Sequence, residues 1–187
     1  VASDNVLGGV MAGNALANAI GKKGTVYVSN VKPGISTTDQ REEGFKAAMA
    51  NYPDITVLET QFNDDDANKA SAQVNAVVAR APDLAGIFGA NLFSAIGSAD
   101  GVKAMGKSGE IKVVAFDAPT RIVDDLKSGL VDMAIAQHPA EIGYMGVMVA
   151  FGHVTGNPVP VSVGTGFTVM TADNIDDPDI SKYVYSD

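Results

Sequence analysis

Residues 101–108, GVKAMGKS, satisfy the phosphate-loop pattern G-x-x-x-x-G-K-[ST] at every fixed position. Such a loop binds a nucleotide when it follows a strand and opens a helix, because backbone N–H groups then face the phosphates. Here the order is reversed: residues 94–105 have helical apolar spacing before the pattern's glycine and lysine, and residues 111–116 read as a strand after them. Gly106 fits a helix C-terminal cap, and Lys107 fits the negative end of that helix. We therefore expect a capped helix end and no nucleotide site.

A second set of polar side chains follows the predicted strands. Asn91 comes after LAGIFGA, Asp117 directly after KVVAF, and Gln137 directly after MAIA. Arg41 begins the helix that follows the first strand. The set offers a guanidinium that donates, a carboxylate that accepts and two amides that do both, which suits vicinal hydroxyl groups. Each residue taken alone could instead cap a helix or a turn.

Catalytic and metal-binding patterns are weaker. No G-x-S-x-G occurs and the chain has only two histidines, so we expect no catalytic residue. Residues 63–66, NDDD, lack the alternating ligands, the glycine and the distant glutamate of a calcium loop, and they suit a helix N-terminus instead. His138 and Glu141 stand three apart without a third ligand. We expect neither a metal nor a cofactor.

The elements that position these residues alternate along the chain. Apolar spacing, caps and β-rich runs predict helices at residues 6–20, 38–51, 67–80, 94–105, 120–128 and 140–155. Strands are predicted at residues 25–29, 55–60, 84–88, 111–116, 133–136 and 167–170. The second helix is expected to begin with Ser36 or Thr37 as its cap. This alternation predicts an α/β fold with a Rossmann-like, mainly parallel sheet flanked by helices, which binds ligands beyond the carboxyl ends of its strands.

Composition excludes several classes of protein. The 187 residues are 46% hydrophobic, enough for one buried domain or for one domain and a piece of another. A net charge of −9 argues against nucleic-acid binding through a basic face, and the absence of cysteine excludes disulfides. No apolar stretch is long enough for a membrane helix. The chain opens without methionine, as a processed chain or a fragment would.

Five segments resemble a known family. ASDNVLGGVMAG, TTDQREEGF, IFGANLFSAIG, VVAFDAPT and AIAQHPAEIGYMGV are similar, in this order, to the ribose-type periplasmic sugar-binding proteins of ABC transporters. The resemblance implies a type I periplasmic binding fold of two lobes, with this chain as its C-terminal portion. Residues 1–137 and 164–187 would form the C-terminal sugar-binding lobe. Residues 138–163 would belong to the N-terminal lobe, with chain crossings near Asp4, Gln137 and Gly164.

The resemblance also implies roles for single residues. Arg41, in its R-x-x-G-F context, matches the sugar-binding arginine of the family. Asn91, Asp117 and Gln137 match its amide, its carboxylate and its hinge glutamine. Simple alignment places Asp65 where ribose binders have an aromatic ring against the sugar, and Phe62 or Asn63 could serve instead. Because of this departure, another pentose, a hexose or a sugar alcohol is an alternative to ribose as the expected ligand.

The function expected from this resemblance is capture of a small sugar or sugar alcohol by a non-enzymatic solute-binding protein. Its partner would be the membrane permease of an ABC transporter, and its location periplasmic, or exported and membrane-tethered. The apolar residues of helix 140–155 would pack on the other lobe or support self-association of this chain. One alternative is the effector domain of a lac-repressor-type transcription regulator. Another is a small α/β enzyme that uses Asp117 and Arg41.

Overall fold

The computed structural model describes residues 1–185, and its core is a seven-stranded sheet. The strands follow the order β3-β2-β5-β6-β7-β9, and β4 pairs with β2 beyond β3. They are β2 (Gly24–Asn30), β3 (Ile55–Val57), β4 (Gln61–Phe62), β5 (Leu84–Gly89), β6 (Lys112–Phe116), β7 (Met133–Gln137) and β9 (Phe167–Met170). Every pairing is parallel except β7 with β9, so the expected mainly parallel α/β fold is confirmed.

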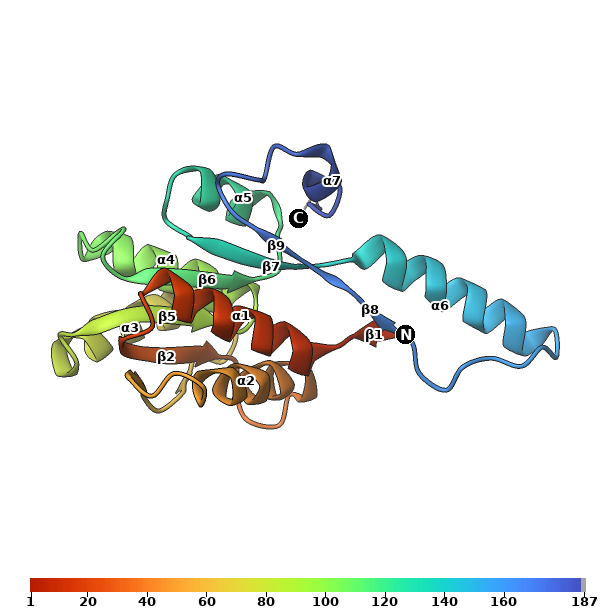
Figure 1. Ribbon diagram of the computed structural model, residues 1–187, viewed down its shortest axis with the longest axis horizontal. Coiled ribbons are helices and arrows are strands. Elements are labelled where there is room, and N and C mark those ends of the chain that lie inside the picture. The colour runs from red at the N-terminus through yellow and green to blue at the C-terminus, as the bar shows by residue number, and fades with distance from the viewer. Residues whose placement is uncertain (186–187) are drawn as a thin grey trace.

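Helices cover both faces of this sheet (Figure 1). They are α1 (Asn5–Ala19), α2 (Ser36–Met49), α3 (Ala67–Arg80), α4 (Leu92–Ala104) and α5 (Thr120–Lys127). Successive residues of β2 point to opposite faces: Val26 and Val28 pack with α1 and α2, whereas Tyr27 packs with α3, α4 and α5. The strands are therefore apolar on both sides, as in other parallel sheets that have helices on both faces.

The segment GVKAMGKS is the end of α4. Gly106 has a φ of +67°, and its N–H donates to the carbonyl of Lys103 over 2.9 Å. The N–H of Lys107 donates to the carbonyl of Val102 over 3.0 Å. These two bonds close the helix in the left-handed turn that glycine favours. The interpretation of this segment as a capped helix end is confirmed.

Two expectations about the region of β3, β4 and α2 were wrong. The strand expected at residues 55–60 ends at Val57, and a separate strand, β4, begins at Gln61; β3 and β4 pair with different parts of β2. Ser36 and Thr37 do not cap α2, because the cap position falls on Ile35, which makes no side-chain capping bond. The carboxylate of Asp39 instead accepts from the N–H of Gly34 over 2.9 Å and closes the preceding turn.

A second, small unit lies beside the main sheet. Strand β1 (Ala2–Ser3) pairs in parallel with β8 (Gly164–Thr165), and α6 (Pro139–Val154) projects away from the body (Figure 1). No residue of α6 is buried. A short helix, α7 (Pro178–Ser181), lies in the C-terminal segment, after the last predicted strand. Among residues 1–185, no helix is both long and apolar enough to cross a membrane.

Candidate functional site

Asp117 and Gln137 meet where β6 and β7 end. The Nε2 group of Gln137 donates to Oδ1 of Asp117 over 2.5 Å, and its Oε1 accepts from the hydroxyl of Ser3 over 2.7 Å. Sequence predicted that Gln137 follows this strand, but Gln137 is the last residue of β7 itself. Asp117 has a φ of +77°, a left-handed conformation that costs a residue with a side chain about 1–2 kcal/mol. Such strain is retained most often at binding and catalytic sites.

Arg41 lies buried between helices and the sheet edge, with 6% of its surface exposed. Its Nε donates to Oδ1 of Asn5 over 2.9 Å, and its Nη1 donates to the carbonyl of Ala90 over 2.8 Å. The guanidinium carbon lies 3.7 Å from the ring centroid of Phe116. Burial lowers the pKa of Arg41, while the nearby charge of Asp117 acts in the opposite direction. An arginine pKa starts so high that the group stays charged at neutral pH.

Asn91 is the N-cap of α4. Its Oδ1 accepts from the N–H of Ser94 over 3.1 Å and from the Ser94 hydroxyl over 2.5 Å. Its Nδ2 donates to Oδ1 of Asp65 over 2.6 Å. The capping role that sequence left open is thus real for Asn91, but it uses only the oxygen, and the NH₂ group faces the loop that follows β4.

The four predicted residues share one edge of the sheet. Arg41 bonds the carbonyl next to Asn91 and the side chain of Asn5, whose amide donates to the carbonyl of Ser3 over 3.3 Å. Ser3 in turn bonds Gln137, which bonds Asp117. Donors and acceptors therefore alternate along one hydrogen-bond network. Hydroxyl groups of a ligand, which both donate and accept, can replace partners within it.

Sequence reasoning missed two members of this network, Ser3 and Asn5, and also the ring of Phe116 that lies against Arg41. Ser3 and Asn5 precede or begin the first helix, and nothing in their spacing separates them from ordinary turn residues. Phe116 ends a buried strand and reads as core. The position of Phe116 directly before Asp117 is the one available signal, because a ring there lies at the same sheet edge.

The three residues considered for the aromatic position have different surroundings. Asn63 is fully buried, and its amide donates to the hydroxyls of Ser29 and Ser94. Its side chain therefore fixes the loop between β4 and α3 to the body of the protein. Phe62 is partly buried, and its carbonyl accepts from Gln73 over 2.8 Å. Asp65 is the exposed residue of the loop that contacts Asn91.

No metal site forms within residues 1–185, which contain no cluster of three His, Cys, Asp or Glu side chains able to hold an ion. His138 lies 3.1 Å from Glu141 and 2.9 Å from the hydroxyl of Thr168, and its ring stacks on Tyr183 with the centroids 3.7 Å apart. These contacts account for His138 as a packed residue at the start of α6.

Comparison with known proteins shows which family the chain resembles. Residues 1–158 match the family model described as a periplasmic binding protein domain. The ribose import binding protein of Haemophilus influenzae is 33% identical over 171 residues, which are 91% of this chain and 58% of that protein.

Two solved structures extend the comparison. An ABC transporter solute-binding protein from Agrobacterium vitis, bound with α-D-tagatopyranose, is 66% identical with a TM-score of 0.97. The match covers 99% of this chain and 62% of that one. A periplasmic solute-binding protein from Actinobacillus succinogenes with bound D-allose is 28% identical, with a TM-score of 0.88 over 92% of this chain and 60% of that one. The chain thus spans less than two thirds of the length of each.

Proposed function

The chain belongs to the family of the periplasmic binding protein domain, and on that basis we propose that the gene product containing it is the solute-binding component of an ABC transporter. It captures a small sugar or sugar alcohol and catalyses no reaction. The observation that carries the proposal is the convergence of Arg41, Asn91, Asp117 and Gln137 at one sheet edge. In open α/β sheets this edge is where ligands bind.

The chemistry of these four side chains favours binding over catalysis. A carboxylate accepts from two hydroxyls, a guanidinium donates to ring or hydroxyl oxygens, and the amides match either partner. The two histidines offer no base for a nucleophile here, since His138 is held by Glu141 and Thr168 and His153 lies exposed on α6. An unpaired polar group in a closed site costs about 1–3 kcal/mol, which lets such a site reject ligands that lack one hydroxyl.

We propose a division of the chain between two lobes. Residues 1–137 and 164–187 form the sugar-binding lobe, and residues 138–163 belong to a second lobe. The pairing of β1 with β8 and the bond between Ser3 and Gln137 support this division, because they bring three chain crossings together. Closure about these crossings would bury the ligand and present both lobes to a permease. In the chain alone, exposed apolar residues of α6 such as Val147 and Phe151 would favour self-association.

We propose D-tagatose as the first ligand to test. The structure of the Agrobacterium vitis protein holds this ketohexose and is 66% identical to this chain over the matched region, whereas the ribose and allose binders reported above are 33% identical or less over theirs. The names of these relatives also support a role in import, with a periplasmic location. None of these three relatives is named as a regulator, so no observation favours the regulator alternative.

Isothermal titration calorimetry on the complete gene product tests the proposal. We expect D-tagatose to bind, and Asp117→Asn to weaken binding about tenfold or more, because a charged hydrogen bond is lost. Asparagine tolerates the left-handed backbone of this position, so the variant should fold. Asp173→Asn, an exposed aspartate in the C-terminal segment, is the control and should leave the Kd unchanged. Failure of the wild-type protein to bind D-tagatose, D-allose or D-ribose, or turnover of any of them, would overturn the proposal.

A further inference from the structure

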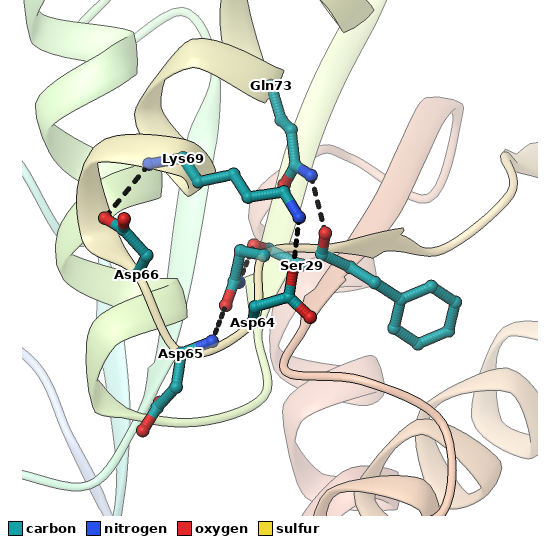
Figure 2. Close-up of polar contacts among 8 residues, drawn as sticks. Ser29, Asp64, Asp65, Asp66, Lys69 and Gln73 are labelled. Carbon is teal, nitrogen blue, oxygen red and sulfur yellow. Dashed lines mark hydrogen bonds and ion pairs between the residues drawn. The ribbon is translucent and has the colours of Figure 1, made fainter.

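The loop between β4 and α3 holds three successive aspartates that have different partners (Figure 2). Asp64 pairs with Lys69, and this hydrogen bond lowers the pKa of the Asp64 carboxyl. Asp66 is the N-cap of α3 and accepts from the N–H groups of Asn68 and Lys69. The side chain of Asp65 points away from both of these pairs (Figure 2). Two of the three carboxylates therefore have local structural roles, and Asp65 has none of this kind.

The backbone of this loop is held in an unusual conformation. Asp64 and Asp65 have φ angles of +56° and +64°, two consecutive left-handed residues that are not glycine. Each such residue costs about 1–2 kcal/mol and persists only where its surroundings fix it. The N–H of Asp64 donates to the carbonyl of Val31 over 2.8 Å, which ties the loop to the chain that leaves β2.

Asn63 is the second anchor of the loop. Its side chain is fully buried; Nδ2 donates to the hydroxyls of Ser29 and Ser94 over 3.1 and 2.7 Å, and Oδ1 accepts from the N–H of Asp65 over 2.9 Å. Ser94 also bonds Asn91, so the residue that fixes Asp65 and the residue that Asp65 contacts share one hydroxyl. The position of Asp65 relative to Asn91 is thus defined by buried contacts.

The carboxylate of Asp65 has room for one more partner. Its Oδ1 accepts from Nδ2 of Asn91 over 2.6 Å, and within residues 1–185 its Oδ2 has no hydrogen-bond partner. The residue is exposed, so this oxygen is open to a ligand at the same sheet edge.

We propose that Asp65 is a specificity-determining residue that accepts a hydrogen bond from a ligand hydroxyl, and that Asn63 is the residue that positions it. This inference rests on the proposed function. A carboxylate here selects ligands that carry a hydroxyl toward the loop, whereas an aromatic ring would offer an apolar face that accepts deoxygenated sugars equally well. The favoured class is a fully hydroxylated hexose or polyol.

The test compares D-tagatose with its 3-, 4- and 5-deoxy derivatives by calorimetry on the complete gene product. We expect the wild-type protein to bind at least one derivative about tenfold or more weakly than D-tagatose, since a charged hydrogen bond is missing. In Asp65→Asn the affinity for D-tagatose should fall about tenfold and the difference from that derivative should largely disappear. Asp64→Asn is the matched control, because it makes the same change in the same backbone conformation one residue away, and it should preserve the difference.

Asn63 is tested through the same ratio of affinities. Asn63→Ala should reduce discrimination between D-tagatose and the deoxy derivative, and adding it to Asp65→Asn should reduce discrimination no further. A purely structural role would lower both affinities equally and leave the ratio unchanged. Asn63→Leu, which keeps the approximate size of the side chain and removes the oxygen that accepts from the N–H of Asp65, replaces Asn63→Ala if thermal unfolding shows that the alanine variant is not folded.

The outcomes separate this inference from the proposed function. If the wild-type protein does not bind D-tagatose, both the proposed ligand and the role of Asp65 are overturned. If it binds D-tagatose but Asp65→Asn keeps the wild-type discrimination among the deoxy derivatives, only the role of Asp65 is overturned.

Discussion

Among single residues, Glu42 connects helix α2, which carries Arg41, to the end of β2. Its carboxylate accepts from Nδ2 of Asn30 over 2.7 Å and from the hydroxyl of Thr60 over 2.6 Å, and it also pairs with Lys46. Burial alone would raise the pKa of Glu42, but these donors outweigh burial and lower it. Glu42 follows Arg41 in α2, so the same helix turn is tied to the end of β2 and provides the guanidinium of the site.

The lowered pKa of Glu42 predicts a pH dependence of stability. A carboxyl whose folded-state pKa is depressed stabilises the fold fully above its ordinary pKa, 4.5, and loses that contribution as pH falls through the folded value. Glu42→Gln should therefore unfold more easily in urea at pH 7, by about 1–2 kcal/mol, and should lose less stability than the wild type between about pH 5 and pH 3. Glu43→Gln, exposed and adjacent, should behave like the wild type. Parallel acid profiles of the wild type and Glu42→Gln would contradict this role.

At the scale of elements, the crossing of α1 and α2 determines where Arg41 sits. A Cβ atom at Gly9 would lie 2.0 Å from the carbonyl oxygen of Arg41, and one at Gly44 would lie 2.0 Å from the carbonyl oxygen of Val6. The two helix backbones therefore touch, and this close approach brings Arg41 on α2 within 2.9 Å of Asn5 on α1. Glycine is required here by space, since neither position has a left-handed backbone.

Gly9→Ala should force the two helices apart. We expect a loss of about 1–3 kcal/mol of stability from overpacking, together with weaker sugar binding, because the bond from Arg41 to Asn5 is stretched. Gly143→Ala is the matched control: a Cβ in this part of α6 meets nothing within 4 Å, so the substitution should be neutral or stabilise the chain by up to about 1 kcal/mol. Thermal unfolding of both variants is measured on the 187-residue chain, and calorimetry with D-tagatose is then measured on Gly9→Ala in the complete gene product. Equal unfolding midpoints for Gly9→Ala and the wild type would show that the crossing tolerates a methyl group.

At the scale of the whole molecule, the site occupies one edge of one sheet, and the small β1–β8 unit stands beside it. Asp117 and Gln137 are partly exposed, and Asp65 on the other side of the site is exposed. Hydroxyl groups bound on an open edge still compete with water, and their hydrogen bonds gain strength only where water is excluded. Strong capture of a sugar therefore needs a second surface over the edge.

This predicts that residues 1–187 alone bind sugar weakly or not at all. Calorimetry should give a Kd for D-tagatose at least about a hundredfold higher for the 187-residue chain than for the complete gene product, because half of the buried contacts are missing. Circular dichroism and thermal unfolding of the short chain serve as the check that it is folded. Micromolar affinity in the 187-residue chain would contradict the two-lobe proposal.

The sequence by itself determined the order of the helices and strands, and the edge of the sheet at which the candidate ligand residues lie. Apolar runs of five or six residues and helices with periodic apolar positions are local patterns, so β6, α3 and β9 were predicted at or within one residue of their bounds. The reversed order around Gly106 was likewise local and sufficient to exclude a phosphate loop. The four candidate ligand residues were located because the carboxyl ends of parallel strands share one edge.

Tertiary structure decided which side chains complete that edge. Ser3 and Asn5 join the network because residues more than thirty positions away along the chain fold beside them, and no local pattern records such contacts. The cap of α2 also escaped prediction, because Asp39 closes a turn that competes with serine capping. Asp65 is the clearest case, because its position in the run NDDD predicts only the start of a helix. Only the buried amide of Asn63 and the left-handed backbone turn this one carboxylate toward Asn91 and leave its neighbours to Lys69 and to α3.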